Sequence, residues 1–428
     1  MKKLCVFALK IFLRFNQIMS KIKPFRALRP KNKLAKDVSS VPYDVLNAPE
    51  AREIAKNNPH SFLRVSRSEI DLSDELSPYS DEVYAKAKEN FEQLQANGIL
   101  QLENESSLYV YQLQMGKQIQ TSIVACCSID EYDTDLIKKH EKTRPDKEND
   151  RTRHIIELEA QTGLIFLCYR GTDEINALVD EITQTEPLYN FEAEDVNKNS
   201  IRNTIWKVSE TNTLVSAFEQ VPAIYIADGH HRAASSSRAR AEMRSRNPHH
   251  TGDEDYNFVI AALFPAEQLK ILAYNRVVKD LNGLSKDEFL TKLRENFEIT
   301  ENANPNPDSR GTFSMYLDGK WFGLKPNFTA PNSVIEGLDV SVLENYILHP
   351  ILGIEDVRTD KRIDFVGGIR GTSELEKLVD ADKFKVAFSM FATTIDDLLN
   401  VSDANEIMPP KSTWFEPKLR DGLLIHKI

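Results

Sequence analysis

Cysteine is scarce in this chain of 428 residues, which contains four. The four cysteines show no paired spacing, so the sequence gives no sign of a disulfide framework. Cys126 and Cys127 are adjacent within an apolar, strand-like run and are expected to be buried thiols. This usage suits a reducing compartment, and we expect a cytoplasmic protein.

Long apolar runs are also missing. The only stretch that resembles a signal peptide is residues 1–18, where Lys10 and Arg14 interrupt the apolar residues and no small-residue cleavage site follows. The stretch is too short and too charged to span a bilayer, so no membrane partner is expected. It is predicted to be an upstream start or a disordered basic extension before Met19, with an amphipathic surface helix as the remaining option.

Positive charge is in deficit. The chain has 54 Lys and Arg against 65 Asp and Glu, which gives a net charge of −11 and makes a general nucleic-acid binder unlikely. Its hydrophobic content of 41% and charged content of 28% are ordinary for a soluble globular protein. The length is sufficient for two or three domains.

Several familiar catalytic motifs are absent. The sequence has no Walker loop, no protein-kinase motif set and no Gly-x-Ser-x-Gly nucleophile elbow. It also contains no internal repeat or heptad seam. A protein with this sequence that moves phosphate must therefore do so on an unusual scaffold.

The most informative stretch that is present is AIYIADGHHRAASSSR, at residues 223–238. An apolar strand stops at a glycine and a helix-prone segment follows, so the helix N-terminus and its unpaired N–H groups form an anion site. The stretch predicts a phosphate-binding loop made by Gly229, His230, His231 and Arg232, with Asp228 directly before it. Metal binding by the adjacent histidines and a plain solvated turn are the alternatives.

A charged run, KKHEKTRPDKENDRTRH at residues 138–154, precedes this loop. One interpretation is a solvated helix-loop-helix that includes His154. The other is a cationic lid over a phosphate substrate, with Glu141 as a general base. If Glu141 lies far from the loop, Asp44 of VPYDV is the next candidate for that role.

Two further segments carry candidate binding residues. Residues 364–376, DFVGGIRGTSELE, predict a strand, a glycine turn with Arg370, and a helix opened by a capping box of Ser373 and Glu376. Arg370 offers a planar cation for a carboxylate or phosphate. In MPPKSTWFEPKLRDG, at residues 408–422, Lys411 follows a rigid Pro-Pro and is a second candidate substrate-binding residue.

The order of predicted elements is mixed α/β (α+β), with a mixed or antiparallel sheet favoured over a doubly wound one. Residues 130–143 are predicted to be a helix that precedes the loop. The expected organisation has four parts: an extension at 1–18, an N-terminal α/β region at 19–105, a phosphate-binding core at 106–280 and a C-terminal α/β region at 281–428.

Seven motifs in one order resemble the domain-of-unknown-function family 1015 over nearly everything from Met19 onward. They are PFRALRP, VPYDV, NPHSFLRV, KKHEKT, ADGHHRAA, GGIRGT and MPPKSTWFEPKLRDGL. Through its Asp-Gly-His-His-Arg loop, that family is distantly similar to the ParB/sulfiredoxin-like fold, which includes free-serine kinases. The resemblance implies a ParB/sulfiredoxin-like core, with α/β extensions on both sides, that binds a nucleotide.

The resemblance also implies a phosphotransferase that acts on free L-serine, or O-phosphoserine in the reverse direction. ATP, ADP or pyrophosphate would be the donor. Catalytic roles fall on Glu141, His231 and Asp228, with Asp228 as a ligand of Mg²⁺ and Arg370 holding the amino-acid carboxylate. One alternative is a ParB-like nucleotide-binding regulator or DNA-associated protein. Another is a sulfiredoxin-like repair enzyme, but that activity requires a reactive cysteine near the loop, and this sequence has none there.

Overall fold

The computed structural model describes residues 20–428. The prediction for residues 1–18 therefore lies outside the described residues. The described chain divides into two compact units, of which the first contains residues 20–138, 143–268 and 417–428. The second contains residues 269–416 together with the short connection 139–142. The predicted division after residue 280 differs from this grouping, because β14 (Tyr274–Val278) pairs with later strands of the second unit.

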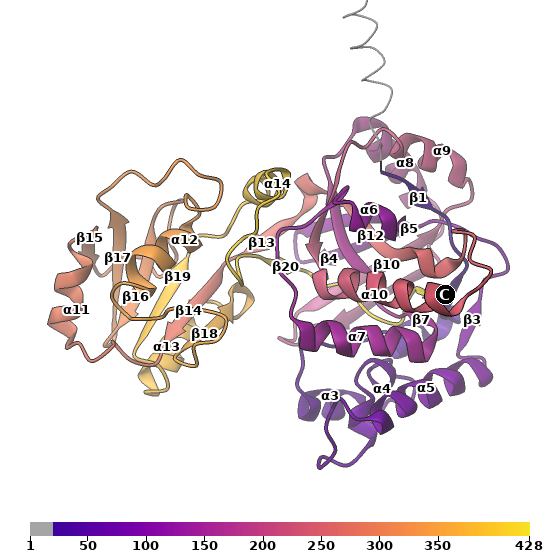
Figure 1. The fold of residues 1–428 in the computed structure, drawn as a ribbon, viewed down its shortest axis with the longest axis horizontal. Coiled ribbons are helices and arrows are strands. Elements are labelled where there is room, and N and C mark those ends of the chain that lie inside the picture. The colour runs from indigo at the N-terminus through magenta and orange to yellow at the C-terminus, as the bar shows by residue number, and fades with distance from the viewer. Residues whose placement is uncertain (1–19) are drawn as a thin grey trace, which may run out of the picture. The chain divides into compact units, whose positions relative to one another are not determined.

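A nine-stranded mixed sheet forms the centre of the first unit (Figure 1). The strand β11 pairs with β6 in parallel and with β8 in antiparallel orientation, which confirms the expected mixed α/β class. The apolar run of β11 is buried throughout, as expected for an inner strand. In sheet order the strands are β6 (Ile137–Lys138), β11 (Ile224–Asp228), β8 (Ile165–Tyr169), β12 (Phe258–Pro265), β5 (Gln118–Ser128), β4 (Tyr109–Met115), β10 (Ser200–Lys207) and β9 (Tyr189–Glu194), with β1 (Ile22–Lys23) paired to β5.

Helices of the first unit pack on this sheet and on one another. The helix α7 (Pro145–Leu158) contacts both α10 (His230–Arg246) and α5 (Asp81–Ala96), and Figure 1 shows α10 and α7 running side by side. The buried side of α10 consists of alanines and serines, and such small side chains allow a close approach. The remaining helices are α2 (Ala35–Val38), α3 (Ala48–Ala55), α4 (Leu63–Ser66), α6 (Ile129–Asp133), α8 (Asp173–Thr183) and α9 (Thr211–Phe218).

A four-stranded sheet joins distant parts of the sequence in the first unit. Its order is β3 (Leu100–Leu102), β2 (Ala27–Pro30), β21 (Ile425–Lys427) and β7 (Ala160–Gln161). The last segment of the chain therefore completes a sheet begun by residues near its start. This return places residues 417–424, which precede β21, in the same unit as α10.

The second unit is built on a six-stranded antiparallel sheet. Its order is β15 (Phe297–Glu301), β17 (Lys320–Pro326), β16 (Phe313–Leu317), β19 (Val386–Met390), β14 and β18 (Ile363–Gly367), and β13 (Lys270–Leu272) pairs separately with β20 (Trp414–Glu416). Its helices are α11 (Lys286–Leu293), α12 (Asp339–Leu343), α13 (Thr372–Asp380) and α14 (Ile395–Asp403). No helix within residues 20–428 combines the length and apolarity needed to cross a membrane.

Two local predictions are wrong. The helix predicted over residues 130–143 stops at Asp133, because the backbone turns through positive φ at Asp135 and residues 137–138 then pair with β11. The capping box of Ser373 and Glu376 is not formed. Instead, α13 begins at Thr372, and its N-cap is Gly371, where no side chain caps the helix.

Candidate functional site

The strand β11 leads into α10 through a single glycine. Gly229 is the N-cap of α10 at φ 93° and ψ 27°, a left-handed conformation that glycine adopts without a steric penalty. No side chain caps this helix N-terminus. Because glycine has no side chain, the N-cap residue supplies no capping acceptor to the first turn of α10, and a helix N-terminus of this kind favours an anion.

Asp228 is held at the start of this turn by a lysine distant in sequence. Its Oδ1 accepts the Gly229 N–H at 2.8 Å, and its Oδ2 lies 2.5 Å from Nζ of Lys418. Burial alone would raise the pKa of Asp228, but the ammonium of Lys418 and the Gly229 N–H lower it to about 2. Asp228 is therefore an ionised carboxylate paired with a cation, and it fixes the geometry of the turn.

Arg232, the third residue of α10, forms an ion pair in which the arginine is partly buried and the carboxylate is buried. One of its guanidinium nitrogens donates to both oxygens of Asp421, at 2.9 and 2.8 Å, and the guanidinium lies 5.2 Å from the ring centre of Tyr43. A Cβ on Gly163 would come within 1.9 Å of this guanidinium, so a glycine at that position leaves room for the pair. The Asp421 carboxylate raises the pKa of Arg232, and the arginine remains charged.

These groups line a small cavity of about 40 Å³ beside the turn. A space of this size holds a water molecule or two. An anionic group can therefore bind against these residues, but the cavity does not enclose a nucleotide. Asp44, the alternative catalytic carboxylate, is also in the lining. The lining residues are Pro42, Asp44, Leu164, Phe166, Asp228, Gly229, Arg232, Lys418, Leu419 and Asp421.

The short connection that carries Glu141 is anchored at both ends next to the turn. On one side Lys138 pairs with Tyr225 in β11, and on the other the backbone N–H of Arg144 donates to Nε2 of His231 at 3.0 Å. Because Nε2 of His231 accepts this bond, the ring in its neutral form carries its proton on Nδ1.

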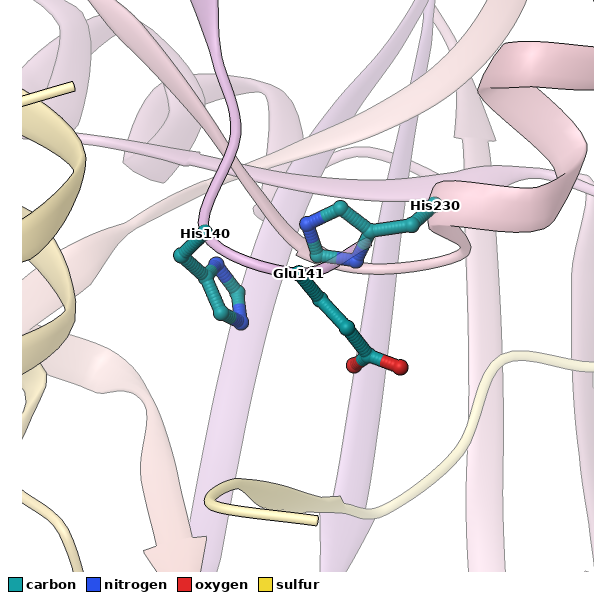
Figure 2. A group of neighbouring side chains, drawn as sticks. All are labelled: His140, Glu141 and His230. Carbon is teal, nitrogen blue, oxygen red and sulfur yellow. The ribbon is translucent and has the colours of Figure 1, made fainter. Parts of the chain in front are cut away.

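Figure 2 draws side chains from both units: His140 and Glu141 belong to the connection 139–142 of the second unit, and His230 begins α10 in the first. The two histidines are 1% and 5% exposed, whereas Glu141 is only partly buried.

The other predicted binding residues lie in the second unit. Arg370 is exposed in a short 3-10 helix, and Lys411 is exposed at φ 58° with its ammonium 5.5 Å from the ring centre of Tyr274. Close packing explains why glycine occupies positions 367 and 368, before Arg370. A Cβ on Gly367 would lie 2.9 Å from the Trp414 ring, and one on Gly368 would lie 2.6 Å from the Ala273 carbonyl oxygen.

The charged run after Glu141 is less exposed than either of its interpretations implies. His154 is 4% exposed, and its Nε2–H donates to the carbonyl of Val65 at 3.0 Å. Burial lowers the pKa of His154 to about 3, with Arg151 adding to the effect, so this histidine is neutral and contributes no charge to a lid. Asp150 is also buried, where it accepts from the hydroxyl of Tyr84 at 2.8 Å.

Sequence reasoning missed Lys418 and Asp421 as residues of this site. Both lie in MPPKSTWFEPKLRDGL, one of the motifs that carries the family resemblance, but the residue predicted to bind substrate in that motif was Lys411. A buried Asp228 and a buried Arg232 would each need a partner of opposite charge. A search of the other motifs for such partners could have identified Lys418 and Asp421.

The fold and the turn together define a mixed α/β protein whose candidate site lies at a glycine-capped helix N-terminus. The chain belongs to the family described as Protein of unknown function (DUF1015), whose model matches residues 22–341. This confirms the family resemblance found in the motifs. The search of curated proteins gave no match.

Three solved structures illustrate the structural comparison. A free serine kinase in complex with AMP is 11% identical with a TM-score of 0.35, and the match covers 69% of this chain and 86% of that chain. A conserved hypothetical protein from Pyrococcus furiosus is 13% identical with a TM-score of 0.34, covering 73% and 97%. SbnI with a C-terminal truncation, from Staphylococcus aureus, is 10% identical with a TM-score of 0.33, covering 68% and 82%.

Proposed function

We propose that this protein is a phosphotransferase that moves a phosphoryl group between a nucleotide or pyrophosphate donor and a small hydroxyl amino acid, free L-serine first among them. The observation that carries the proposal is the N-terminus of α10, which begins at the left-handed Gly229 beside the ion pair of Asp228 with the cation of Lys418. Backbone N–H groups and a nearby ammonium together favour a phosphate at this point. The choice of serine rests on the family's distant resemblance to free-serine kinases.

The chemistry requires few groups. The phosphoryl group passes from the leaving oxygen of the donor to the serine Oγ, and the proton of the serine hydroxyl must be removed. Glu141 is the proposed acceptor of that proton, because the family resemblance assigns it this role and its carboxylate is of the type that serves as a general base. The N-terminus of α10, the side chain of His231 and the cation of Lys418 are proposed to form the binding site of the donor phosphates.

The surroundings of Asp228 fit Mg²⁺ poorly. Both of its oxygens already accept hydrogen bonds, one of them from the Lys418 ammonium at 2.5 Å, and a divalent cation there would lie next to a positive charge. We therefore derive no step through a cation at Asp228. In the assay below, Mg²⁺ accompanies the donor as its ordinary counterion.

Incubation of the full chain with L-serine, Mg²⁺ and each donor in turn tests the proposal. We expect O-phosphoserine, detected by ³¹P NMR, with at least one of ATP, ADP or pyrophosphate. L-Alanine, which lacks the hydroxyl group, is the matched acceptor control and should give no product. Folded protein that forms no phosphoserine with any of the three donors would refute the proposal.

A further inference from the structure

Two arginine side chains of the first unit lie over one buried tyrosine, Tyr43 of the VPYDV motif. The guanidinium of Arg151 lies 4.1 Å from the ring centre of Tyr43, and that of Arg232 lies 5.2 Å from the same centre. We propose that Tyr43 is a positioning residue, whose ring holds the guanidinium of Arg232 in the orientation that binds the donor phosphate. The inference rests on the proposed function, which places the donor at the start of α10.

Arg232 is incompletely fixed by its carboxylate partner. Only Nη2 donates to Asp421, and the other guanidinium nitrogens form no hydrogen bond within residues 20–428. Pairing through two nitrogens would fix the plane of an arginine, but a contact through one nitrogen leaves the plane able to turn. Arg232 also lines the cavity beside Gly229, so its orientation changes the surface that meets an anion there. A second contact is needed to hold that orientation, and the Tyr43 ring provides it.

Tyr43 is itself held in place. It is 7% exposed, and its carbonyl accepts a hydrogen bond at 3.0 Å from Nη1 of Arg67, the residue that ends α4. The same nitrogen donates to the carbonyl of Leu46 at 2.9 Å, so one arginine fixes the backbone on both sides of Asp44. A side chain that orients another must be immobile, and burial on a fixed backbone meets this condition.

The ring adds direction to a layer that is already balanced in charge. Nε and Nη2 of Arg151 both lie against Oδ2 of Asp150, at 2.9 and 2.8 Å, just as Arg232 pairs with Asp421. Two cations therefore have two carboxylates. The face of an aromatic ring attracts a cation placed over it, and this attraction depends on the relative orientation of the two groups. Tyr43 thus affects how the guanidinium is oriented and leaves the net charge unchanged.

The hydroxyl group of Tyr43 has no part in this role. It forms no hydrogen bond to any of the described residues, 20–428. Burial raises the pKa of Tyr43 to about 12, so the ring is uncharged at neutral pH. Phenylalanine, which keeps the aromatic face and lacks the hydroxyl, should therefore replace tyrosine at this position.

Binding of ATP, ADP and pyrophosphate to the full chain, measured by titration calorimetry without L-serine, tests the role of Tyr43. Y43L removes the ring and should weaken donor binding by about 5- to 30-fold, the range of a desolvated cation–π contact. Y43F should bind the donors like the parent protein, because the ring is retained. A residue that only stabilised the fold would lower the melting temperature of Y43L and leave the donor affinity of the folded protein unchanged.

Tyr79 provides the matched control. The ammonium of Lys147 lies 5.7 Å from the centre of its ring, but this tyrosine is 45% exposed. Y79L therefore also removes an aromatic ring from beside a cation. It should bind all three donors like the parent protein.

The outcomes separate this inference from the proposed function. Equal affinity of Y43L and the parent protein, or equal weakening by Y43F and Y43L, would overturn the positioning role and leave the phosphate site in place. A folded parent protein that binds none of the three donors would refute the phosphate site, and the positioning role with it. If Y43L does not fold, Y43M decides by the same comparison, because the flexible methionine side chain fills space without an aromatic face.

Discussion

Lys418 and Asp228 form an ion pair of 2.5 Å between residues that are 190 positions apart in the sequence. The pair joins the C-terminal segment of the chain to the turn that begins α10. It provides a cation at this turn in addition to Arg232, whose guanidinium is bonded to Asp421.

Replacement of Lys418 by methionine tests whether this cation holds the donor. A hydrogen bond to a charged group contributes about 1.5–3 kcal/mol, so K418M should weaken donor binding by about 10- to 150-fold. Equilibrium binding of each nucleotide, followed by calorimetry, is the measurement. K117M, at an exposed hairpin turn, is the matched control and should bind the donor like the parent protein. Unchanged affinity in K418M would remove the lysine from the site.

Glu141 is the residue proposed to take the hydroxyl proton. E141Q retains the shape of the side chain but accepts no proton, so kcat for phosphoserine formation should fall by about 10²–10⁴-fold while the protein stays folded. K142M, which changes the exposed neighbour, should retain most of the activity. Near-normal turnover by E141Q would transfer the role to another carboxylate, with Asp44 in the lining of the cavity as the next to test.

Arg232 and Asp421 should be strongly coupled in stability. The R232M variant leaves a carboxylate that is only 4% exposed without its cation, and such a loss costs about 3–5 kcal/mol. Addition of D421N should recover much of this loss, since the remaining carboxylate charge is then removed. Urea unfolding of the two single variants and the double variant gives the coupling energy. Additive losses in the double variant would contradict a direct ion pair.

The same coupling affects how Arg232 variants are interpreted. A fall in donor affinity in R232A could arise from the unpaired Asp421 and the disturbed start of α10. K418M is therefore the sharper probe of phosphate binding.

His154 should make the protein less stable as the pH falls. Its pKa is about 3 in the folded protein and about 6.5 in the unfolded chain, so the unfolded chain binds the proton first. The free energy of unfolding should decrease between pH 6.5 and pH 3, with a contribution from this group of up to about 1.4 kcal/mol per pH unit.

H154Q tests this contribution, because glutamine can still donate to the Val65 carbonyl but does not titrate. Chemical unfolding at several pH values should show a smaller pH dependence for H154Q than for the parent. H249Q, a change at an exposed histidine, should leave the pH dependence as it is in the parent. Parallel curves for H154Q and the parent would show that His154 is not buried as a neutral group.

Local sequence patterns were sufficient for much of the fold. The apolar run before Asp228 and the glycine after it predicted the β11–Gly229–α10 unit, because strand, turn and helix preferences there all agree. Residues 130–143 show where such patterns fail. Their composition favours a helix, but the pairing of residues 137–138 with β11, a contact across the sequence, overrides that preference.

The candidate site was predictable in part for the same reason. Gly229 and His231 follow from one continuous motif, whereas the partners of Asp228 and Arg232 come from residues 418 and 421. Pairing between charges so far apart depends on the tertiary fold, which no local pattern encodes. Family resemblance placed those two residues within a motif but did not assign them a role.

The return of residues 417–428 to the first unit has a consequence during synthesis of the chain. Arg232 leaves the ribosome 189 residues before Asp421, and every residue of 269–416 is made in that interval. Throughout that time Arg232 lacks its ion-pair partner Asp421, and β2 lacks its neighbouring strand β21. Folding of the first unit is thus completed only after translation of the second, and chaperones would meet an unfinished sheet for most of that period.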